Sequence, residues 1–178
     1  MKNILAISGS LRAESTNLKI IEYVSKLASG LLKISVFQNL SHLPAFNPDL
    51  DAGGVVPPVE VADFRRQIKE ADGVLICTPE YVFAVPGALK NAIDWTVSSG
   101  VLLNKPAALI TASGLGEKAH ESLLLTLKTL EAKISDNSAL LISHARTKVN
   151  SEGIVSDAAT IEALKKLIES FIATIDEK

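Results

Sequence analysis

Short apolar runs alternate with amphipathic helical patterns from one end of the chain to the other. The run Val74–Cys77 is apolar at every position, as strands are when both faces of a parallel sheet are covered. The alternation predicts an α/β fold, a mainly parallel sheet with helices on both faces. The expected strands are residues 4–7, 31–37, 73–77, 106–112 and 138–143. The expected helices are residues 18–28, 59–71, 88–98, 117–132 and 157–175.

The amino-acid composition is typical of globular proteins, and it argues against some classes of binding partner. Of the 178 residues, 47% are hydrophobic and 21% are charged, and we expect one domain spanning residues 1–178. The net charge of −2 argues against a nucleic-acid or anionic-membrane binder. The single cysteine, Cys77, leaves no intrachain disulfide and no multi-cysteine metal site. No apolar run reaches the ~18 residues that span a bilayer, and the first is too short for a signal peptide, so we expect a cytoplasmic protein.

The first apolar run ends abruptly in the polar stretch Ser8–Asn17, and a helical pattern begins directly afterwards. A loop in that position meets a helix N-terminus, where unpaired backbone N–H groups and a partial positive charge favour an anion such as phosphate. Gly9 permits close backbone approach, and Glu14 is expected to point into solvent. The candidate phosphate ligands are Ser10, Arg12, Ser15, Thr16 and Asn17. N-capping alone would explain one or two of them, and neither a Walker loop nor a Gly-x-Gly-x-x-Gly turn is present.

Three irregular segments follow predicted strands and are expected to meet at one edge of the sheet. They are Ser8–Asn17, Pro79–Pro86 and Ser113–Gly116, which are neighbours in the strand order 2-1-3-4-5. The second carries proline and two aromatic residues, and the third is rich in glycine. Apolar side chains beside exposed backbone amides suit a flat heterocycle. A phosphate at one end and a planar ring at the other describe FMN.

Three spaced motifs resemble those of the NADPH-dependent FMN reductase family, which includes chromate, quinone and azo-dye reductases. They are Gly9-Ser10-Leu11-Arg12-x-x-Ser15-x-Asn17, Leu43-Pro44-x-Phe46-Asn47-x-Asp49, and Pro79-Glu80-Tyr81-x-x-x-x-Pro86-Gly87-x-Leu89-Lys90-Asn91-x-x-Asp94-Trp95. The resemblance implies a flavodoxin-like fold, tightly bound FMN, a homodimer or homotetramer, and a first motif that holds the FMN phosphate. The residues that it implies beside the flavin ring are Pro79, Glu80, Tyr81, Val82, Phe83, Ser113 and Gly114.

The chain departs from the family pattern in two places. Val82 stands where members often carry Asn, and Ala84 stands where they often carry Ser. The segment Gly114–Lys118 is poorer in glycine than is usual and lacks an arginine. These departures bear on the contacts at the flavin edge, on the preference between NADPH and NADH, and on the range of electron acceptors.

Several other conspicuous residues are expected to have structural roles. Arg65 is expected on the outer face of its helix, and the long loop Asn39–Pro58 is expected to pack through Leu43, Phe46 and Leu50. The remaining structural assignments are Trp95 in the core or an interface, Cys77 as an inert buried thiol, and Lys90 with Asp94 as an ion pair one helical turn apart.

The predicted function is a flavoprotein reductase that passes electrons from NADPH or NADH through FMN to a small acceptor such as a quinone, free flavin, azo compound or chromate. One open ring face would serve donor and acceptor in turn, a ping-pong cycle. No catalytic side chain and no metal site is expected, since His42, His120 and His144 are scattered. The alternative is a flavodoxin-like electron carrier, against which Arg12 and the weak net charge count. The motifs of a phospho-acceptor signalling domain and of a Gly-x-Ser-x-Gly hydrolase are missing.

Overall fold

Five parallel strands form the centre of the molecule in a computed structural model that describes residues 1–150 and 152–177. The strand order is β2-β1-β3-β4-β5, so the predicted flavodoxin-like order 2-1-3-4-5 is confirmed. The strands are β1 (Lys2–Ser8), β2 (Leu32–Val36), β3 (Gly73–Thr78), β4 (Ala107–Ala112) and β5 (Ala139–Ile142). Both β3 and β4 are buried along their whole length, as their continuous apolar sequences predict.

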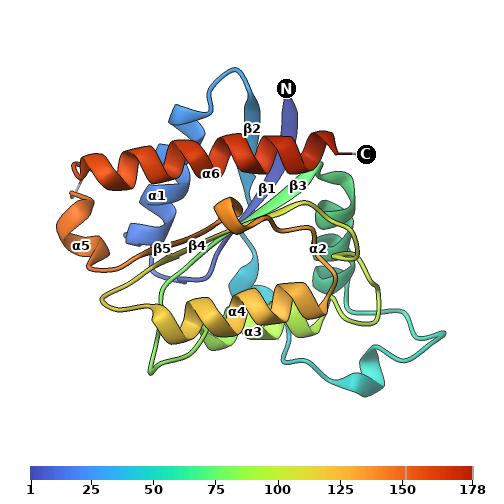
Figure 1. Ribbon diagram of the computed structural model, residues 1–178. Helices are drawn as coiled ribbons and strands as arrows, with labels where there is room; N and C mark the ends of the chain where they lie inside the picture. The colour runs from blue at the N-terminus through green and yellow to red at the C-terminus, as the bar shows by residue number, and fades with distance from the viewer. Residues whose placement is uncertain (151, 178) are drawn as a thin grey trace.

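Helices cover both faces of this sheet (Figure 1). Helices α1 (Thr16–Leu27) and α6 (Ala158–Asp176) pack on one face, around core residues such as Leu75, Ile110 and Phe171. On the other face, Phe64, Leu89 and Leu123 form a second core with the sheet. They belong to α2 (Val59–Glu70), α3 (Gly87–Asp94) and α4 (Glu117–Thr129), and the one-turn helix α5 is Ala145–Lys148. None of the helices in the described part of the chain is both long and apolar enough to cross a membrane.

Two helix starts follow the capping chemistry of their sequences. The side chain of Ser15 accepts a hydrogen bond from the backbone N–H of Asn17 at 3.2 Å, which makes Ser15 the N-cap of α1. The carboxylate of Asp157 accepts from the backbone N–H of Thr160 at 2.8 Å, and this bond confirms the expected N-cap of α6. Hydrogen bonds from Thr160 hold the pKa of Asp157 below its ordinary value.

Helix α3 is shorter than the sequence pattern predicts. It ends at Asp94 rather than at Ser98. The hydroxyl of Thr96 donates to the carbonyl of Ile93 at 2.6 Å, and that of Ser99 donates to the carbonyl of Thr96 at 3.0 Å. Such side-chain bonds compete with the helical ladder, so the chain continues in turns instead of a further helical turn.

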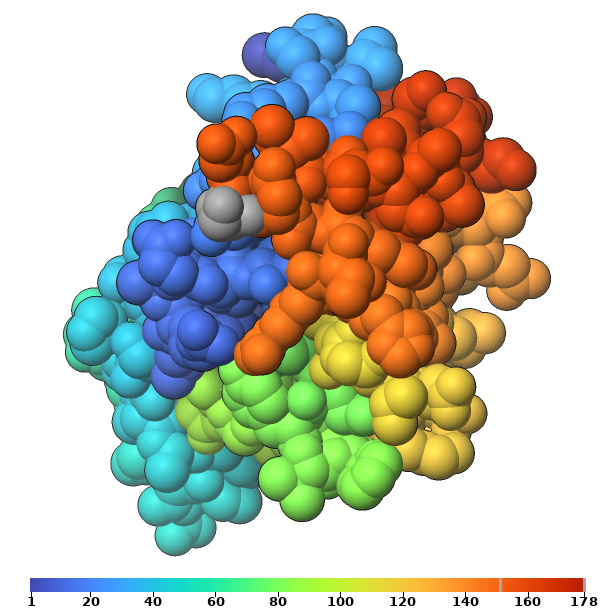
Figure 2. Space-filling view, turned by 90° about the vertical axis from the view of Figure 1, so that its left-hand side faces the viewer, coloured from blue at the N-terminus to red at the C-terminus, as the bar shows by residue number. Residues whose placement is uncertain are grey.

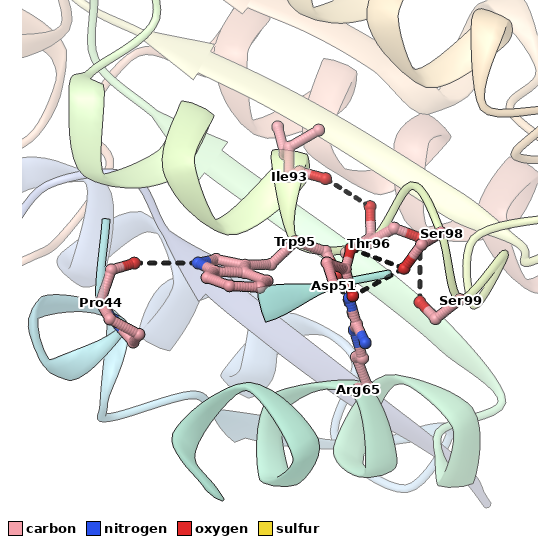
Figure 3. Close-up of polar contacts among 8 residues, drawn as sticks. All are labelled: Pro44, Asp51, Arg65, Ile93, Trp95, Thr96, Ser98 and Ser99. Atoms are coloured by element: carbon pink, nitrogen blue, oxygen red, sulfur yellow. Dashed lines mark hydrogen bonds and ion pairs between the residues drawn. The ribbon is translucent and has the colours of Figure 1, made fainter. Parts of the chain in front are cut away.

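The expectation that Arg65 lies on the outer face of α2 is wrong. Its side chain is only 13% exposed, because it turns inward and donates from Nε to the carbonyl of Trp95 at 2.7 Å (Figure 3). Its Nη2 lies 2.6 Å from a carboxylate oxygen of Asp51, which is itself only 6% exposed. The hydroxyl of Ser98 donates to the other oxygen of Asp51 at 2.6 Å. We call Asp51, Arg65, Trp95 and Ser98 the polar clasp.

The clasp attaches the long segment Asn39–Pro58 to α2 and to the turns after α3, and a second set of hydrogen bonds attaches it to α3 itself. It contains two 3-10 turns, Leu40–His42 and Pro48–Leu50. The carbonyl of Pro44 accepts from Asn91 and from the indole nitrogen of Trp95, both at 2.9 Å. Trp95 is completely buried, which confirms its place in the core. Leu43 is buried and Phe46 packs against the ring of Trp95, whereas Leu50 is 41% exposed and does not pack as expected.

Candidate functional site

A cavity of about 500 Å³ opens at the carboxyl ends of the strands, a volume within the usual range for small-ligand sites. Figure 2 looks onto this edge and shows the blue N-terminal segment, the green segment near residue 80 and the orange segment near residue 146 around one depression. The lining residues come from the segments that follow β1, β3, β4 and β5. They are Ser10, Arg12, Ser15, Thr16, Asn17, Pro79, Glu80, Tyr81, Ala112, Ser113, Gly114, His144, Ala145, Arg146 and Thr147.

The segment after β1 forms the wall of the cavity at the N-terminus of α1. Its backbone joins β3 directly, since the N–H of Gly9 donates to the carbonyl of Cys77 at 2.8 Å. A Cβ atom on Gly9 would lie 2.3 Å from the hydroxyl oxygen of Thr78, so only glycine fits there without movement. The close approach that the sequence suggested at Gly9 is therefore a contact with the neighbouring strand end.

Ser10 and Arg12 differ sharply in their partners. The buried hydroxyl of Ser10 lies 3.4 Å from the phenol oxygen of Tyr81, and this contact links the segments after β1 and β3. The guanidinium of Arg12 forms no hydrogen bond or ion pair with residues 1–150 or 152–177. Glu14 is exposed, as expected, and its carboxylate lies 3.1 Å from the ammonium of Lys19. Arg12 thus faces the cavity with its charge uncompensated.

The side chain of Asn17 is buried at the base of the cavity and is already engaged by the protein. Its Nδ2 donates to the carbonyl of Ala112 at 3.4 Å, and its Oδ1 accepts from the thiol of Cys77 at 3.3 Å. These contacts tie α1 to the ends of β3 and β4. Burial raises the pKa of the Cys77 thiol, which fits the inert role expected for it.

The segment after β3 makes a tight hairpin turn beside the cavity. The backbones of Tyr81 and Ala84 exchange two hydrogen bonds of 3.0 Å, and the central residues Val82 and Phe83 have φ angles of 51° and 58°. Both central side chains point into solvent, with exposures of 95% and 69%, and neither lines the cavity. The structure therefore brings Pro79, Glu80 and Tyr81 to the site and leaves Val82 and Phe83 at the tip of the turn.

Glu80 directs its carboxylate to the N-terminus of α4. Its two oxygens accept backbone N–H groups from Gly116 at 3.2 Å and from Ala119 at 2.9 Å. Its backbone N–H donates to the hydroxyl of Ser113 at 3.1 Å, which joins the segments after β3 and β4. The negative charge at Glu80 is thus balanced by a helix N-terminus.

A fourth wall, formed by residues 144–147 after β5, is absent from the sequence-based prediction. The backbone N–H of His144 donates to the carbonyl of Gly114 at 2.9 Å, and that of Ala145 donates to the carbonyl of Ser113 at 3.0 Å. These bonds hold His144, Arg146 and Thr147 against the cavity. The position directly after the fifth strand was the available signal, because all parallel strands end at the same edge.

The described residues contain no group of three or more His, Cys, Asp or Glu side chains that could hold a metal ion. The polar groups that line the cavity are hydroxyls, two guanidinium groups, the phenol of Tyr81, the imidazole of His144, and the Glu80 carboxylate and Asn17 amide, both of which already bond protein atoms. The uncompensated guanidinium groups suit an anion, and the phenol and hydroxyls suit a flat polar ring.

Comparison with known proteins points to a single family. A model of the NADPH-dependent FMN reductase family matches residues 2–147. The NAD(P)H-dependent FMN reductase of Pseudomonas aeruginosa is 33% identical over 172 residues, which cover 94% of this chain and 91% of the relative. The NADPH:quinone oxidoreductase of Arabidopsis thaliana is 35% identical over 181 residues, with coverages of 96% and 90%. The solved structure of FerB, a flavoenzyme NAD(P)H:(acceptor) oxidoreductase from Paracoccus denitrificans, matches with a TM-score of 0.80 at 28% identity, covering 99% of this chain and 98% of FerB.

Proposed function

Because the chain belongs to the NADPH-dependent FMN reductase family, an oxidoreductase family with FMN and NAD(P)H as cofactors, we propose that it binds FMN in the cavity described above. It would take electrons from NADPH or NADH and pass them to a small acceptor such as a quinone, free flavin, azo compound or chromate. The observation that carries this proposal is the cavity itself, where the unpaired Arg12 and the aromatic Tyr81 line the same space at the carboxyl ends of parallel strands.

The phosphate end of the ligand is assigned to the segment after β1. The guanidinium of Arg12 supplies charge, the hydroxyl of Ser10 supplies a donor, and the N-terminus of α1 supplies backbone N–H groups near Ser15 and Thr16. The side chain of Asn17 already bonds protein atoms, so we assign its main contribution to fixing this segment. The donor set is that of a phosphate site, and it fits FMN.

The ring end of the ligand is assigned to Pro79, Glu80 and Tyr81 on one side and to Ser113 and Gly114 on the other. Bound flavin would supply the redox chemistry, and these residues would bind and orient its ring. We assign no catalytic side chain. One open cavity serves donor and acceptor in turn, which gives a ping-pong cycle. Val82 and Phe83 would reach the ring only if the turn that carries them folds toward the cavity.

An absorption spectrum of the purified protein reconstituted with FMN, followed by anaerobic addition of NADPH, tests this function. The proposal predicts oxidised-flavin bands that NADPH bleaches and that a quinone restores. Bound FMN that NADPH does not reduce would instead identify a flavodoxin-like electron carrier. The unpaired Arg12 favours the reductase, since flavodoxins usually bind the phosphate with Thr and Ser alone.

We further propose that the chain works in the cytoplasm as a homodimer or homotetramer built from single domains of residues 1–178. The exposed aromatic side chain of Phe83 beside the cavity supports self-association, because such a group is costly to leave in water. Light scattering coupled to size-exclusion chromatography would give the mass of the assembly, and a monomer at micromolar concentration would contradict this part of the proposal.

A further inference from the structure

Two guanidinium groups line the cavity, and no carboxylate neutralises either of them. Arg12 follows β1 and Arg146 lies in α5, and neither forms an ion pair or a side-chain hydrogen bond within the described residues. The carboxylate at the cavity, Glu80, is held by two backbone N–H groups of the α4 N-terminus. Glu14, near Arg12 in sequence, pairs with Lys19. The cavity therefore has a surplus of positive charge.

The position of Arg146 is fixed by the surrounding backbone. Ala145, directly before it, is buried in the core beside α1 and α6 and donates its N–H to Ser113. The hydroxyl of Thr147, directly after it, donates to the carbonyl of His144 at 2.8 Å. Arg146 thus belongs to a short anchored helix, and it lines the cavity together with Ser15 and Thr16 at the N-terminus of α1. Figure 1 shows α5 beside that end of α1.

The charge of the FMN phosphate gives a reason for a second cation in the cavity. A phosphate monoester carries about −1.5 to −2 near pH 7. Arg12 contributes one positive charge and the N-terminus of α1 contributes roughly half a charge, so these two alone leave part of a dianion uncompensated. A second guanidinium from another segment completes the balance, and its planar fork suits phosphate oxygens.

We propose that Arg146 is a second phosphate-binding cation, which contacts the FMN phosphate from α5, a segment separate from that of Arg12. This inference rests on the proposed function, because it assigns a new ligand within the same site. It gives α5 a role in selecting FMN over riboflavin, which has the same ring and no phosphate.

Titration of flavins into the flavin-free full-length protein tests the assignment through binding alone. For Arg146→Ala, we expect the dissociation constant of FMN to rise about 10-fold or more, while that of riboflavin changes less than about twofold. Arg146→Lys should recover part of the loss, since it keeps the charge and loses the fork. The FMN affinity of Arg146→Ala should also depend less on salt than that of the parent protein.

Lys148→Ala is the matched control. Lys148 belongs to the same short helix as Arg146 and carries the same charge, yet it does not line the cavity. Its positive charge instead helps to lower the pKa of Asp157. The control should bind FMN like the parent protein. Unchanged FMN affinity in Arg146→Ala, or an equal loss for FMN and riboflavin, would overturn the assignment. If the parent protein binds neither flavin, the proposed function itself fails.

Discussion

The segment Asn39–Pro58 and the segments around the cavity are both irregular, yet Asp51 in the first has protein partners for its charge, whereas two cations around the cavity have none among the described residues. In the first, Asp51 bonds Arg65 and Ser98, and the carbonyl of Pro44 accepts two hydrogen bonds. Around the cavity, the guanidinium groups of Arg12 and Arg146 have no partner in the described part of the chain. None of the residues of Asn39–Pro58 lines the cavity.

On the proposed function, this difference separates a segment that stabilises the fold from segments that bind a ligand. A polar group satisfied within the protein stabilises the fold, whereas a charge left unpaired at a concave surface is available to a ligand. Substitutions in the polar clasp should therefore change stability and leave flavin binding intact. Substitutions of Arg12 or Arg146 should weaken flavin binding and leave stability unchanged.

The largest expected effect is on the clasp side. Asp51→Ala removes the partner of the largely buried Arg65 and should lower the free energy of unfolding by about 3 kcal/mol. Urea unfolding followed by circular dichroism measures this loss. Asp63→Ala breaks the exposed pair with Arg66 and serves as the control, with an expected loss below about 1 kcal/mol. Equal losses of unfolding free energy in the two variants would contradict the claim that the clasp stabilises the fold more than an exposed ion pair does.

On the cavity side, Arg12→Ala should raise the dissociation constant of FMN about 10- to 100-fold, because it removes a charged phosphate donor. The free energy of unfolding should change by less than about 0.5 kcal/mol, since the side chain has no protein partner. Fluorescence quenching of FMN and urea unfolding measure the two quantities. Arg66→Ala, outside the cavity, should leave FMN binding unchanged. Unaltered FMN affinity in Arg12→Ala would refute the phosphate assignment.

A smaller effect is expected at the hairpin tip. Val82 is β-branched and has a φ of 51°, a conformation that costs such residues roughly 1 kcal/mol and that Asn tolerates far better. Val82→Asn should therefore raise the melting temperature by a few degrees. FMN affinity should stay the same, because the Val82 side chain points away from the cavity. A marked change in affinity would show that the turn reaches the flavin.

The smallest predicted effect concerns the pH dependence of the clasp. Burial alone would raise the pKa of Asp51, but hydrogen bonds from Ser98 and Arg65 outweigh it and lower the pKa below its ordinary value of 3.8. Ionised Asp51 therefore stabilises the fold above about pH 4, and this contribution is lost as the pH falls through the lowered value. Between pH 5 and 3, the unfolding free energy of Asp51→Asn should fall less steeply than that of the parent protein. Parallel pH profiles would contradict this prediction.

Sequence patterns predicted the elements that depend on local periodicity. The parallel sheet with helices on both faces followed from the alternation of apolar runs and helices, whereas the strand order came with the flavodoxin-like fold that the family resemblance implies. The cap at Asp157 followed from its position directly before the last helical pattern. The prediction that Arg65 points outward was wrong, because its partners Asp51 and Trp95 lie 14 and 30 residues away along the chain and leave no local pattern. The ion pair of Lys90 with Asp94 is confirmed at 2.6 Å, since it depends only on one helical turn.

The site was predicted only in part for a similar reason. The polar residues after β1 are recognisable because they precede a long amphipathic helix. Helix α5 has four residues and no periodic pattern, so His144 and Arg146 gave no comparable signal. The separation of Val82 and Phe83 from the cavity depends on two positive φ angles, which apolar residues do not predict.

Phosphorus-31 NMR of FMN bound to the full-length protein tests most directly whether the unpaired cations of the cavity hold a phosphate. The phosphate dianion of free FMN takes up a proton and becomes a monoanion near a pKa of about 6. Beside Arg12 and Arg146, the account predicts that the bound phosphate stays dianionic well below that pH, with a resonance distinct from that of free FMN. A bound phosphate that titrates like free FMN would contradict the account and place the phosphate outside the cavity.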